Sequence, residues 1–174
     1  MSETILPDSA PPLPSLPLYQ RPPSQAVTGA LLVLQSREAR QAAAQLAGVG
    51  ETLLASEFAS PVALQQALLE RLLRASVGQQ LLLCGDEAFV WPLHALARNA
   101  GLEADEIHLL RHGESRRAVY CVHCATLQHG DGGEQHDCRS CGVRLEVRRH
   151  FSRRLGAYLG VCADADQPYA EARP

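Results

Sequence analysis

Two cysteine pairs, Cys121-Val122-His123-Cys124 and Cys138-Arg139-Ser140-Cys141, are separated by thirteen residues. A C-x-x-C pair can grip one metal ion from a tight turn, and two such pairs complete a tetrahedral site with four sulfur ligands. Gly142 follows the second pair, where the chain must bend sharply and a side chain would clash. The spacing therefore predicts a zinc-ribbon β domain whose ligands are Cys121, Cys124, Cys138 and Cys141.

Other uses of these cysteines fit the sequence less well. Nothing resembles a signal peptide, so we expect reduced thiols and not two disulfides. A redox-active C-x-x-C usually stands alone beside a βαβ unit. Mononuclear iron in a rubredoxin-like site stays open, because iron also accepts four thiolates. His129 and His136 lie between the pairs and are expected to be solvated, and Cys84 and Cys162 are expected to be buried thiols.

The composition indicates a folded protein without a strong charge bias. An apolar fraction of 46% over 174 residues suffices for one medium domain and one small one. No apolar run approaches the roughly 18 residues that a membrane span needs, so we expect a cytoplasmic protein. All sixteen basic residues are Arg, and the net charge of −3 argues against a dedicated nucleic-acid binder.

The N-terminal residues 1–28 contain seven of the eleven prolines, which disfavours both helices and inner strands. Leu13, Leu16, Leu18 and Tyr19 are interspersed with these prolines. The segment is expected to be either a disordered tail or an extended arm that lies across a partner.

Residues 29–112 are expected to form an α/β domain with a small parallel sheet. Short apolar runs at 30–34, 52–55, 80–84 and 107–110 indicate buried strands. Helical patterns at 37–47, after Ser60-Pro61 and at 88–100 alternate with them, and this order is typical of βαβ units. Residues 113–174 then form the zinc ribbon and an Arg-rich C-terminal segment.

The α/β domain shows no catalytic constellation. The turn after the first strand is Gln35-Ser-Arg-Glu38, without the glycines that let backbone approach a phosphate. The stretch from Leu82 to Phe89, which contains Cys84-Gly85-Asp86, resembles the last βαβ unit of the ferredoxin-reductase NAD(P) module. Asp86 replaces the proline of that family's Cys-Gly-Pro. The resemblance implies a degenerate relative of the module that has lost its cofactor.

The segment from Val147 to Val161 is dense in Arg with interleaved aromatic residues. It can be a solvated basic face beside an anionic thiolate site, a surface that binds nucleic acid, or a docking surface for an acidic protein. We favour docking, because Arg and Tyr often anchor interfaces and the remaining chain lacks a basic footprint. The predicted partner-binding residues are Arg148, Arg149, Phe151, Arg153, Arg154 and Tyr158.

The residues from about 118 to 166 resemble the small DmmA-like subunit of bacterial dimethylamine monooxygenase. The similarity lies in Val119-Tyr-Cys121-Val-His-Cys124, Cys138-x-x-Cys141-Gly142 and Leu145-x-Val147-Arg148, and above all in the string His150-Phe-Ser-Arg-Arg-Leu-Gly-Ala-Tyr158-x-Gly160-Val.

This resemblance implies membership of a heterotrimeric, haem-dependent oxidative N-demethylase. Such a complex converts dimethylamine to methylamine and formaldehyde with O2 and NADPH. Haem, FMN and a [2Fe–2S] cluster would belong to partners, which are a haem-containing oxygenase subunit and a flavin and iron–sulfur reductase subunit. This chain would be a non-catalytic subunit whose zinc site shapes the contact between subunits. The alternatives are a rubredoxin-like iron electron carrier and a nucleic-acid-binding zinc ribbon.

Overall fold

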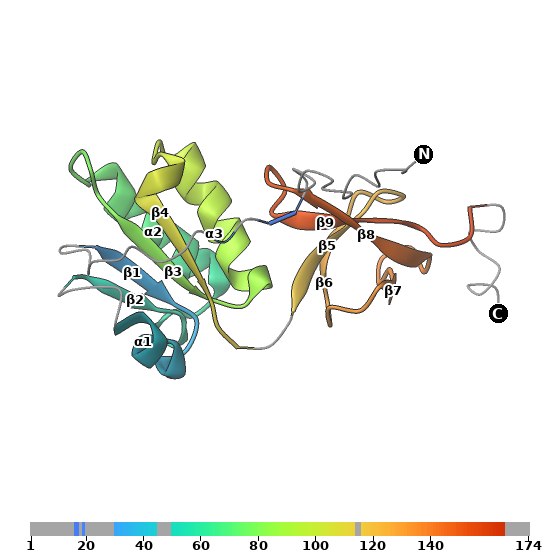
Figure 1. Cartoon of the computed structure of the whole chain (residues 1–174), viewed down its shortest axis with the longest axis horizontal. Helices are drawn as coiled ribbons and strands as arrows, with labels where there is room; N and C mark the ends of the chain where they lie inside the picture. The colour runs from blue at the N-terminus through green and yellow to red at the C-terminus, as the bar shows by residue number, and fades with distance from the viewer. Residues whose placement is uncertain (1–15, 18, 20–29, 45–49, 114–115, 166–174) are drawn as a thin grey trace, which may run out of the picture.

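A computed structural model describes residues 16–17, 19, 30–44, 50–113 and 116–165 of the chain. Two sheets follow one another along the chain (Figure 1). Most of the predicted N-terminal arm, residues 1–28, lies outside the described residues. Within the described part of the chain, every helix is too short or too polar to cross a membrane.

The first sheet has four parallel strands in the order β2-β1-β3-β4. They are β1 (Leu31–Leu34), β2 (Thr52–Leu54), β3 (Leu81–Gly85) and β4 (Ile107–Arg111). Helices α1 (Arg37–Ala44), α2 (Pro61–Leu73) and α3 (Glu87–Asn99) connect them, with short 3₁₀ turns at Ala55–Glu57 and Ala104–Glu106. This parallel α/β architecture confirms the fold class predicted for residues 29–112.

Alternate residues of these strands face two different layers. Leu32, Leu34 and Cys84 pack with Ala39 and Ala43 of α1 on one face. Val33, Leu81 and Leu83 pack on the other face, where α2 and α3 lie. The crossover from β1 to β2 runs one way across the sheet, and those from β2 to β3 and from β3 to β4 run the other way. Because such crossovers are right-handed, α1 lies on one face and α2 and α3 lie on the other. Buried strands covered on both faces explain the unbroken apolar runs in the sequence.

All three α-helices of the first sheet begin at side-chain caps. The Ser36 hydroxyl before α1 accepts a hydrogen bond from the Ala39 amide at 3.4 Å. The Ser60 hydroxyl accepts a hydrogen bond from the Ala63 amide at 3.2 Å, as the Ser60-Pro61 pair predicts. Asp86 caps α3 by accepting from the Phe89 amide at 2.8 Å. Pro92 lies inside α3, beyond its first turn. The sequence pattern also places Pro92 within a helix that begins near Ala88.

The second sheet has five strands in the order β6-β5-β9-β8-β7. They are β5 (Arg117–Cys121), β6 (Leu127–Gly130), β7 (Gln135–Asp137), β8 (Arg144–Ser152) and β9 (Ala157–Cys162). Strands β5 and β9 run parallel, and the other neighbours run antiparallel. Strands β6 and β7 lie between the two cysteine pairs, where the sequence pattern indicates no strand, and β9 lies in the Arg-rich C-terminal segment.

The apolar core continues from the first sheet into the second. One cluster of buried side chains includes Leu68, Val90 and Trp91 from the first part and Val119 and Leu145 from the second. The turn between β8 and β9 lies against α3, so that a Cβ added to Gly156 would lie 3.2 Å from the backbone carbon of Trp91. The two sheets therefore share packing at a junction formed by α3 and the β8–β9 hairpin.

Candidate metal centre

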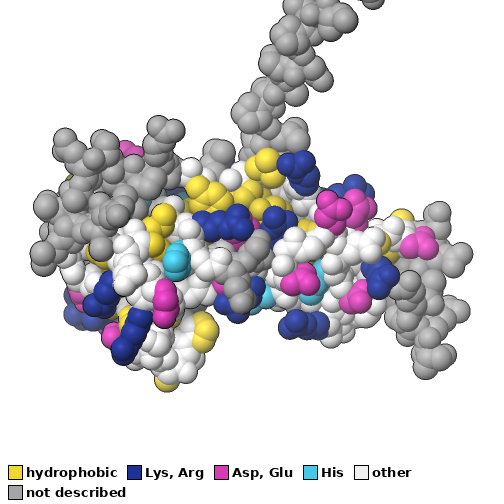
Figure 2. Space-filling model, turned by 60° about the horizontal axis from the view of Figure 1, so that its bottom comes forward, with side chains coloured by type: hydrophobic (Ala, Val, Ile, Leu, Met, Phe, Trp, Pro, Cys, Tyr) yellow, Lys and Arg dark blue, Asp and Glu magenta, His cyan; other side chains and the backbone are white. Residues whose placement is uncertain are grey.

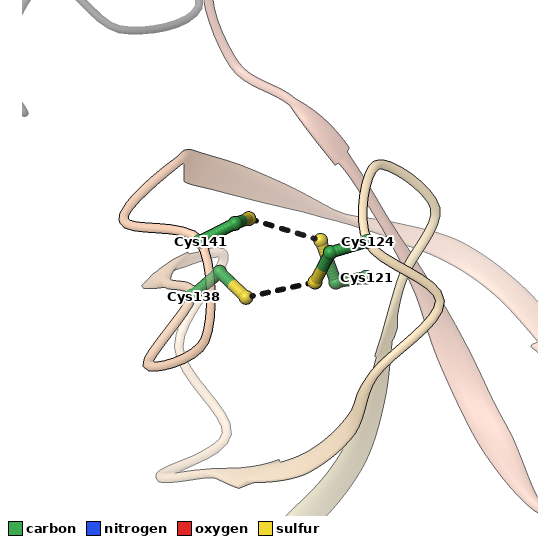
Figure 3. Close-up of side chains that lie close together, drawn as sticks. All are labelled: Cys121, Cys124, Cys138 and Cys141. Carbon is green, nitrogen blue, oxygen red and sulfur yellow. Dashed lines mark hydrogen bonds between the residues drawn. The ribbon is translucent and has the colours of Figure 1, made fainter.

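Two hairpins present the four cysteines. Cys121 ends β5, and the turn that carries Cys124 leads into β6. Cys138 and Cys141 lie in the turn between β7 and β8. These hairpins occupy the two edges of the sheet with β9 between them, and their turns face each other (Figure 3).

The sulfur positions fit a tetrahedral metal. Cys121 Sγ lies 3.9 Å from Cys141 Sγ, and Cys124 Sγ lies 3.6 Å from Cys138 Sγ. All four sulfurs lie within 4.8 Å of one another. A tetrahedron with Zn–S bonds of about 2.3 Å places its sulfurs about 3.8 Å apart. Disulfides are not formed, because they need an S–S distance of about 2.05 Å and all four thiols are free.

The two cysteine turns have the same construction. The backbone amides of His123 and Cys124 donate to Cys121 Sγ, and those of Ser140 and Cys141 donate to Cys138 Sγ. Each turn closes with an amide-to-carbonyl bond, from Ala125 to Cys121 at 2.9 Å and from Gly142 to Cys138 at 2.8 Å. Amides directed at sulfur offset the negative charge of a thiolate.

The four thiols cannot ionise equally without a cation, because like charges this close repel. The Thr126 hydroxyl, 3.3 Å from Cys124 Sγ, lowers the pKa of Cys124 to about 6. Burial raises the pKa of Cys141 to about 12 and also raises that of Cys121. A bound dication would remove this conflict and hold all four as thiolates.

A further hydrogen bond ties the two turns together. Gln128 on β6 accepts from the Arg139 amide in the other turn, at 3.0 Å. In the part of the chain that the structure describes, no histidine nitrogen joins the sulfur cluster. His129 is exposed, as expected, whereas His136 is half-buried with its Nε2 buried, so it is less solvated than expected. Four sulfurs complete a tetrahedron, which is typical of a structural site and not of a catalytic one.

A second site is a cluster of charged side chains around the buried carboxylates at the start of α3, at the junction between the two sheets. Glu87 begins α3 and is 4% exposed; its carboxylate lies 3.7 Å from Arg111 and 3.6 Å from Arg117. Arg116 contacts Asp86 at 2.7 Å. Basic side chains, drawn in dark blue, lie over the middle of the face seen in Figure 2. The residues that link the sheets therefore pair with both carboxylates at the start of α3.

Comparison with known proteins adds a family to this geometry. Residues 118–161 match the family described as "Dimethylamine monooxygenase subunit DmmA-like, C-terminal domain". The chain is also 58% identical over 148 residues to the "Heme-dependent oxidative N-demethylase delta subunit" of Ectopseudomonas mendocina (strain ymp). That alignment covers 83% of this chain and 85% of the relative. No solved structure matches the chain.

The chain belongs to the DmmA-like family. The matched C-terminal domain runs from β5 to β9 and contains all four cysteines. The family predicted from the cysteine pairs and the His150–Val161 string is thereby confirmed. The relative extends the similarity well beyond this domain, because its alignment covers most of the chain.

The structure separates the predicted partner-binding residues of this DmmA-like chain into two groups. Arg148, Arg149, Arg153 and Arg154 are exposed. Phe151 and Tyr158 are 4% and 6% exposed, so most of each ring packs inside the protein, although Tyr158 also lines a surface cavity. Phe151 packs on Trp91, with ring centroids 4.6 Å apart, and Tyr158 packs on Phe151 at 5.2 Å.

A bulge explains why the Arg side chains point outward. Val147 pairs with Gly160 and Phe151 with Tyr158, so β8 has more residues between these pairs than β9. The bulge leaves Arg148, Arg149 and His150 all exposed in succession. Sequence reasoning missed it because the alternation of apolar and polar residues ends at Val147.

Cys84 is buried as predicted: burial raises the pKa of its thiol to about 11, and it donates to the Ala39 carbonyl at 3.6 Å. Cys162 was also expected to be buried, but it is only half-buried at the end of β9, where its thiol donates to the Asp164 carbonyl at 2.9 Å. Neither thiol joins the four-sulfur cluster.

At the crevice where the strand order reverses, the Gln35 side chain bonds to Asp86 beside a cavity of about 340 Å³, which Ser36, His112 and Arg116 also line. In open parallel sheets, ligands bind at the carboxyl ends of the two central strands, here β1 and β3. Gln35 follows β1, donates to Asp86 at 2.9 Å and accepts from the Asp86 amide at 2.7 Å. Gly85 leaves room for it, since an added Cβ would lie 2.6 Å from the Gln35 side chain.

Proposed function

We propose that this chain is an accessory, non-catalytic subunit of a multi-subunit oxidative N-demethylase. The observation that carries the proposal is the 58% identity to a protein named as the delta subunit of a haem-dependent oxidative N-demethylase. The match to a dimethylamine monooxygenase subunit family favours dimethylamine as the substrate of the complex. Methylamine and formaldehyde would be its products, with O2 and NADPH consumed.

The four-cysteine site supports a structural role within this complex. We propose that Cys121, Cys124, Cys138 and Cys141 hold one zinc ion, because their sulfurs have tetrahedral spacing and leave no position for substrate. Zinc would cross-link two hairpins whose strands are only three to nine residues long. The shape of the surrounding surface then depends on the metal, including the exposed Arg148, Arg149, Arg153 and Arg154.

The remaining cofactors are assigned to partners. Haem, FMN and a [2Fe–2S] cluster would belong to a haem-containing oxygenase subunit and to a flavin and iron–sulfur reductase subunit. The four cysteines form the sole group of potential metal ligands found among the described residues. Cytoplasmic location and a heterotrimeric stoichiometry are parts of the same proposal.

The experiment is co-expression of the chain with the two partner subunits, followed by purification, metal analysis and an amine assay. We expect one zinc per chain, stable co-purification and formaldehyde production from dimethylamine by the complex. We expect no production by the chain alone. Demethylation by the isolated chain would contradict the proposal, as would failure to associate with either subunit.

The same preparation tests the rubredoxin-like alternative. Iron would also fit four sulfurs at this spacing, and ferric thiolate absorbs strongly in visible light whereas zinc thiolate does not. A red, redox-active chain with one iron would replace the structural role by electron transfer. A nucleic-acid-binding role fits less well, because the net charge is −3 and Arg148 lies 3.1 Å from Glu146.

A further inference from the structure

A groove of about 480 Å³ lies between α3 and the turn that joins β8 and β9. Arg98 borders it from the helix, and Arg153 and Arg154 border it from the turn. The volume falls within the range of about 300–1,000 Å³ that is typical of binding sites in proteins. The groove thus lies between α3 and the β8–β9 turn, whose residues are more than fifty positions apart in sequence.

The charge of the groove is uniformly basic. None of the residues that line it carries a carboxylate. Arg153 and Arg154 are exposed and form no ion pair with any residue in the described ranges. Arg98 pairs with Glu103 at 3.0 Å, but both side chains are exposed, and such pairs contribute at most about 1 kcal/mol. Arg98 also donates to the Leu102 carbonyl. The guanidinium groups of Arg153 and Arg154 are therefore the ones most available to carboxylates.

The floor of the groove is apolar. It includes Trp91, Ile107 and Leu109, which are 3%, 2% and 7% exposed. His94 also borders the groove, and its buried Nδ1 has no hydrogen-bond partner in the part of the structure that is described. Burial lowers the pKa of His94, and the nearby Arg98 and Arg153 lower it further. A ligand that supplies both carboxylates and apolar groups would match these walls and this floor.

We propose that the groove docks an acidic segment of a partner subunit, with carboxylates on Arg153 and Arg154 and an apolar side chain against the floor. The inference rests on the proposed function and makes it more specific. It divides the Arg-rich segment, because Arg148 and Arg149 line a separate cavity that also contains Glu134 and Glu146. That second cavity has mixed charge and no comparable preference for acidic groups.

The binding test compares two charge-reversal variants of the full chain. Arg153→Glu/Arg154→Glu changes the groove, and Arg37→Glu/Arg40→Glu makes the same charge change on exposed residues of α1. Affinity for the co-expressed oxygenase and reductase subunits is measured by biolayer interferometry at several salt concentrations. We expect the groove variant to bind about tenfold or more weakly, and the control to change less than about threefold. Zinc content and unfolding midpoint establish that each variant is folded.

A third variant, Arg148→Glu/Arg149→Glu, tests the second cavity as the alternative docking surface. If that variant loses binding while Arg153→Glu/Arg154→Glu retains it, the groove is not the docking surface, although the chain remains part of the complex. Equal losses in the groove variant and the α1 control would also overturn the proposal, because the effect would then reflect net charge alone.

A second probe separates this inference from the proposed function. Fluorescein-labelled octaglutamate is titrated with the chain at about 50 mM salt and followed by fluorescence anisotropy. We expect binding by the native chain and the α1 control, and its loss in Arg153→Glu/Arg154→Glu. If the peptide binds in this pattern but the chain does not bind either subunit, the acidic-ligand site in the groove is supported and the proposed function is contradicted. If Arg153→Glu/Arg154→Glu bound the peptide as tightly as the native chain does, the proposed groove would be contradicted.

Discussion

Ala125 and Gly142 occupy equivalent positions, each directly after the second cysteine of its turn. Their φ angles are +58° and +72°, and Ala125 is the single non-glycine residue with positive φ among the described residues. A side chain in this conformation costs about 1–2 kcal/mol. The two turns thus share a left-handed residue that lets the amide close the loop, although glycine supplies it in one turn only.

Exchanging these residues should change stability in opposite directions. We expect Ala125→Gly to raise the free energy of unfolding of the metal-loaded chain by about 0.5–1 kcal/mol, because strain is relieved. Gly142→Ala should lower it by about 1 kcal/mol or more, because a side chain enters the same left-handed conformation. Urea unfolding measures both.

The control for these exchanges is Ala67→Gly, inside α2. There glycine only weakens a helix, so the free energy of unfolding should fall by about 1 kcal/mol. If Ala125→Gly also destabilised the chain, the strain assigned to that position would be contradicted.

Tyr158 makes stability depend on alkaline pH. Burial raises its pKa to about 12, and the nearby Glu87 carboxylate adds to the effect while Arg117 opposes it. The raised pKa means that the folded chain holds the phenolic proton more tightly than the unfolded chain does. This contribution is complete below pH 10, the ordinary tyrosine value, and is lost as pH rises toward 12.

The measurement is urea unfolding at several pH values between 9 and 12. We expect the free energy of unfolding to fall over this window, and less steeply in Tyr158→Phe, which has no proton to lose. Ionisation of tyrosine, followed by ultraviolet absorbance, should occur later in the folded than in the unfolded chain. Identical slopes in the native chain and the variant would contradict this account.

At the scale of elements, the sequence predicts what local patterns determine. The strands of the first sheet and the cap at Ser60 follow from apolar runs and from the Ser-Pro pair. The cluster of four cysteine sulfurs follows from their spacing alone. Strand β9 and the burial of Phe151 and Tyr158 do not, because they depend on α3, whose Trp91 lies sixty residues before Phe151. A segment rich in Arg and aromatic residues is predicted to be exposed when the helix that packs against its aromatic side chains is not known.

Strands β6 and β7 were missed for a different reason. They have four and three residues and lie at the edges of their sheet. Strands this short have weak intrinsic stability. The proposed metal would hold the two cysteine turns that adjoin them together, and the Gln128–Arg139 hydrogen bond adds to this constraint. Their stability should therefore depend on the metal.

Removal of one ligand tests this dependence. Cys138→Ser should lose the metal during dialysis against a chelator, because a three-sulfur site binds more weakly. We expect amide protection in β6 and β7 to fall by at least about tenfold, while β1 and β3 stay protected. Hydrogen exchange with mass spectrometry measures both. Cys162→Ser is the control, since that thiol lies outside the cluster and should leave metal content unchanged.

At the scale of the molecule, one of the two buried clusters among the described residues spans both sheets, and the other lies between α1 and the first sheet. The predicted boundary divides the sequence into residues 29–112 and 113–174. The buried cluster that spans both sheets contains residues from both sides of this boundary, such as Val90 and Leu145. Trp91 contacts Phe151, and its indole donates to the Tyr19 hydroxyl at 3.3 Å, so a described residue of the N-terminal segment also reaches the junction. Aromatic pairs of this kind contribute about 0.5–1.5 kcal/mol each beyond their buried area.

This shared core predicts that metal release and unfolding of the junction occur together. Trp91 is the single tryptophan of the chain, so its fluorescence reports on the junction alone. In urea, the midpoint for Trp91 emission should coincide with the midpoint for zinc release, followed with a chromogenic chelator. Zinc release at clearly lower urea would show instead that the second sheet unfolds independently.

A glycine at the junction allows the coupling to be weakened selectively. Gly156 has a φ of +62°, and a Cβ there would lie 3.2 Å from the backbone carbon of Trp91. Gly78 also has a positive φ, +84°, but an added Cβ would meet nothing within 4 Å. Gly78→Ala therefore adds only backbone strain of about 1–2 kcal/mol and should keep the two midpoints together. Gly156→Ala adds a clash between the hairpin and α3, and should shift Trp91 emission to lower urea than zinc release.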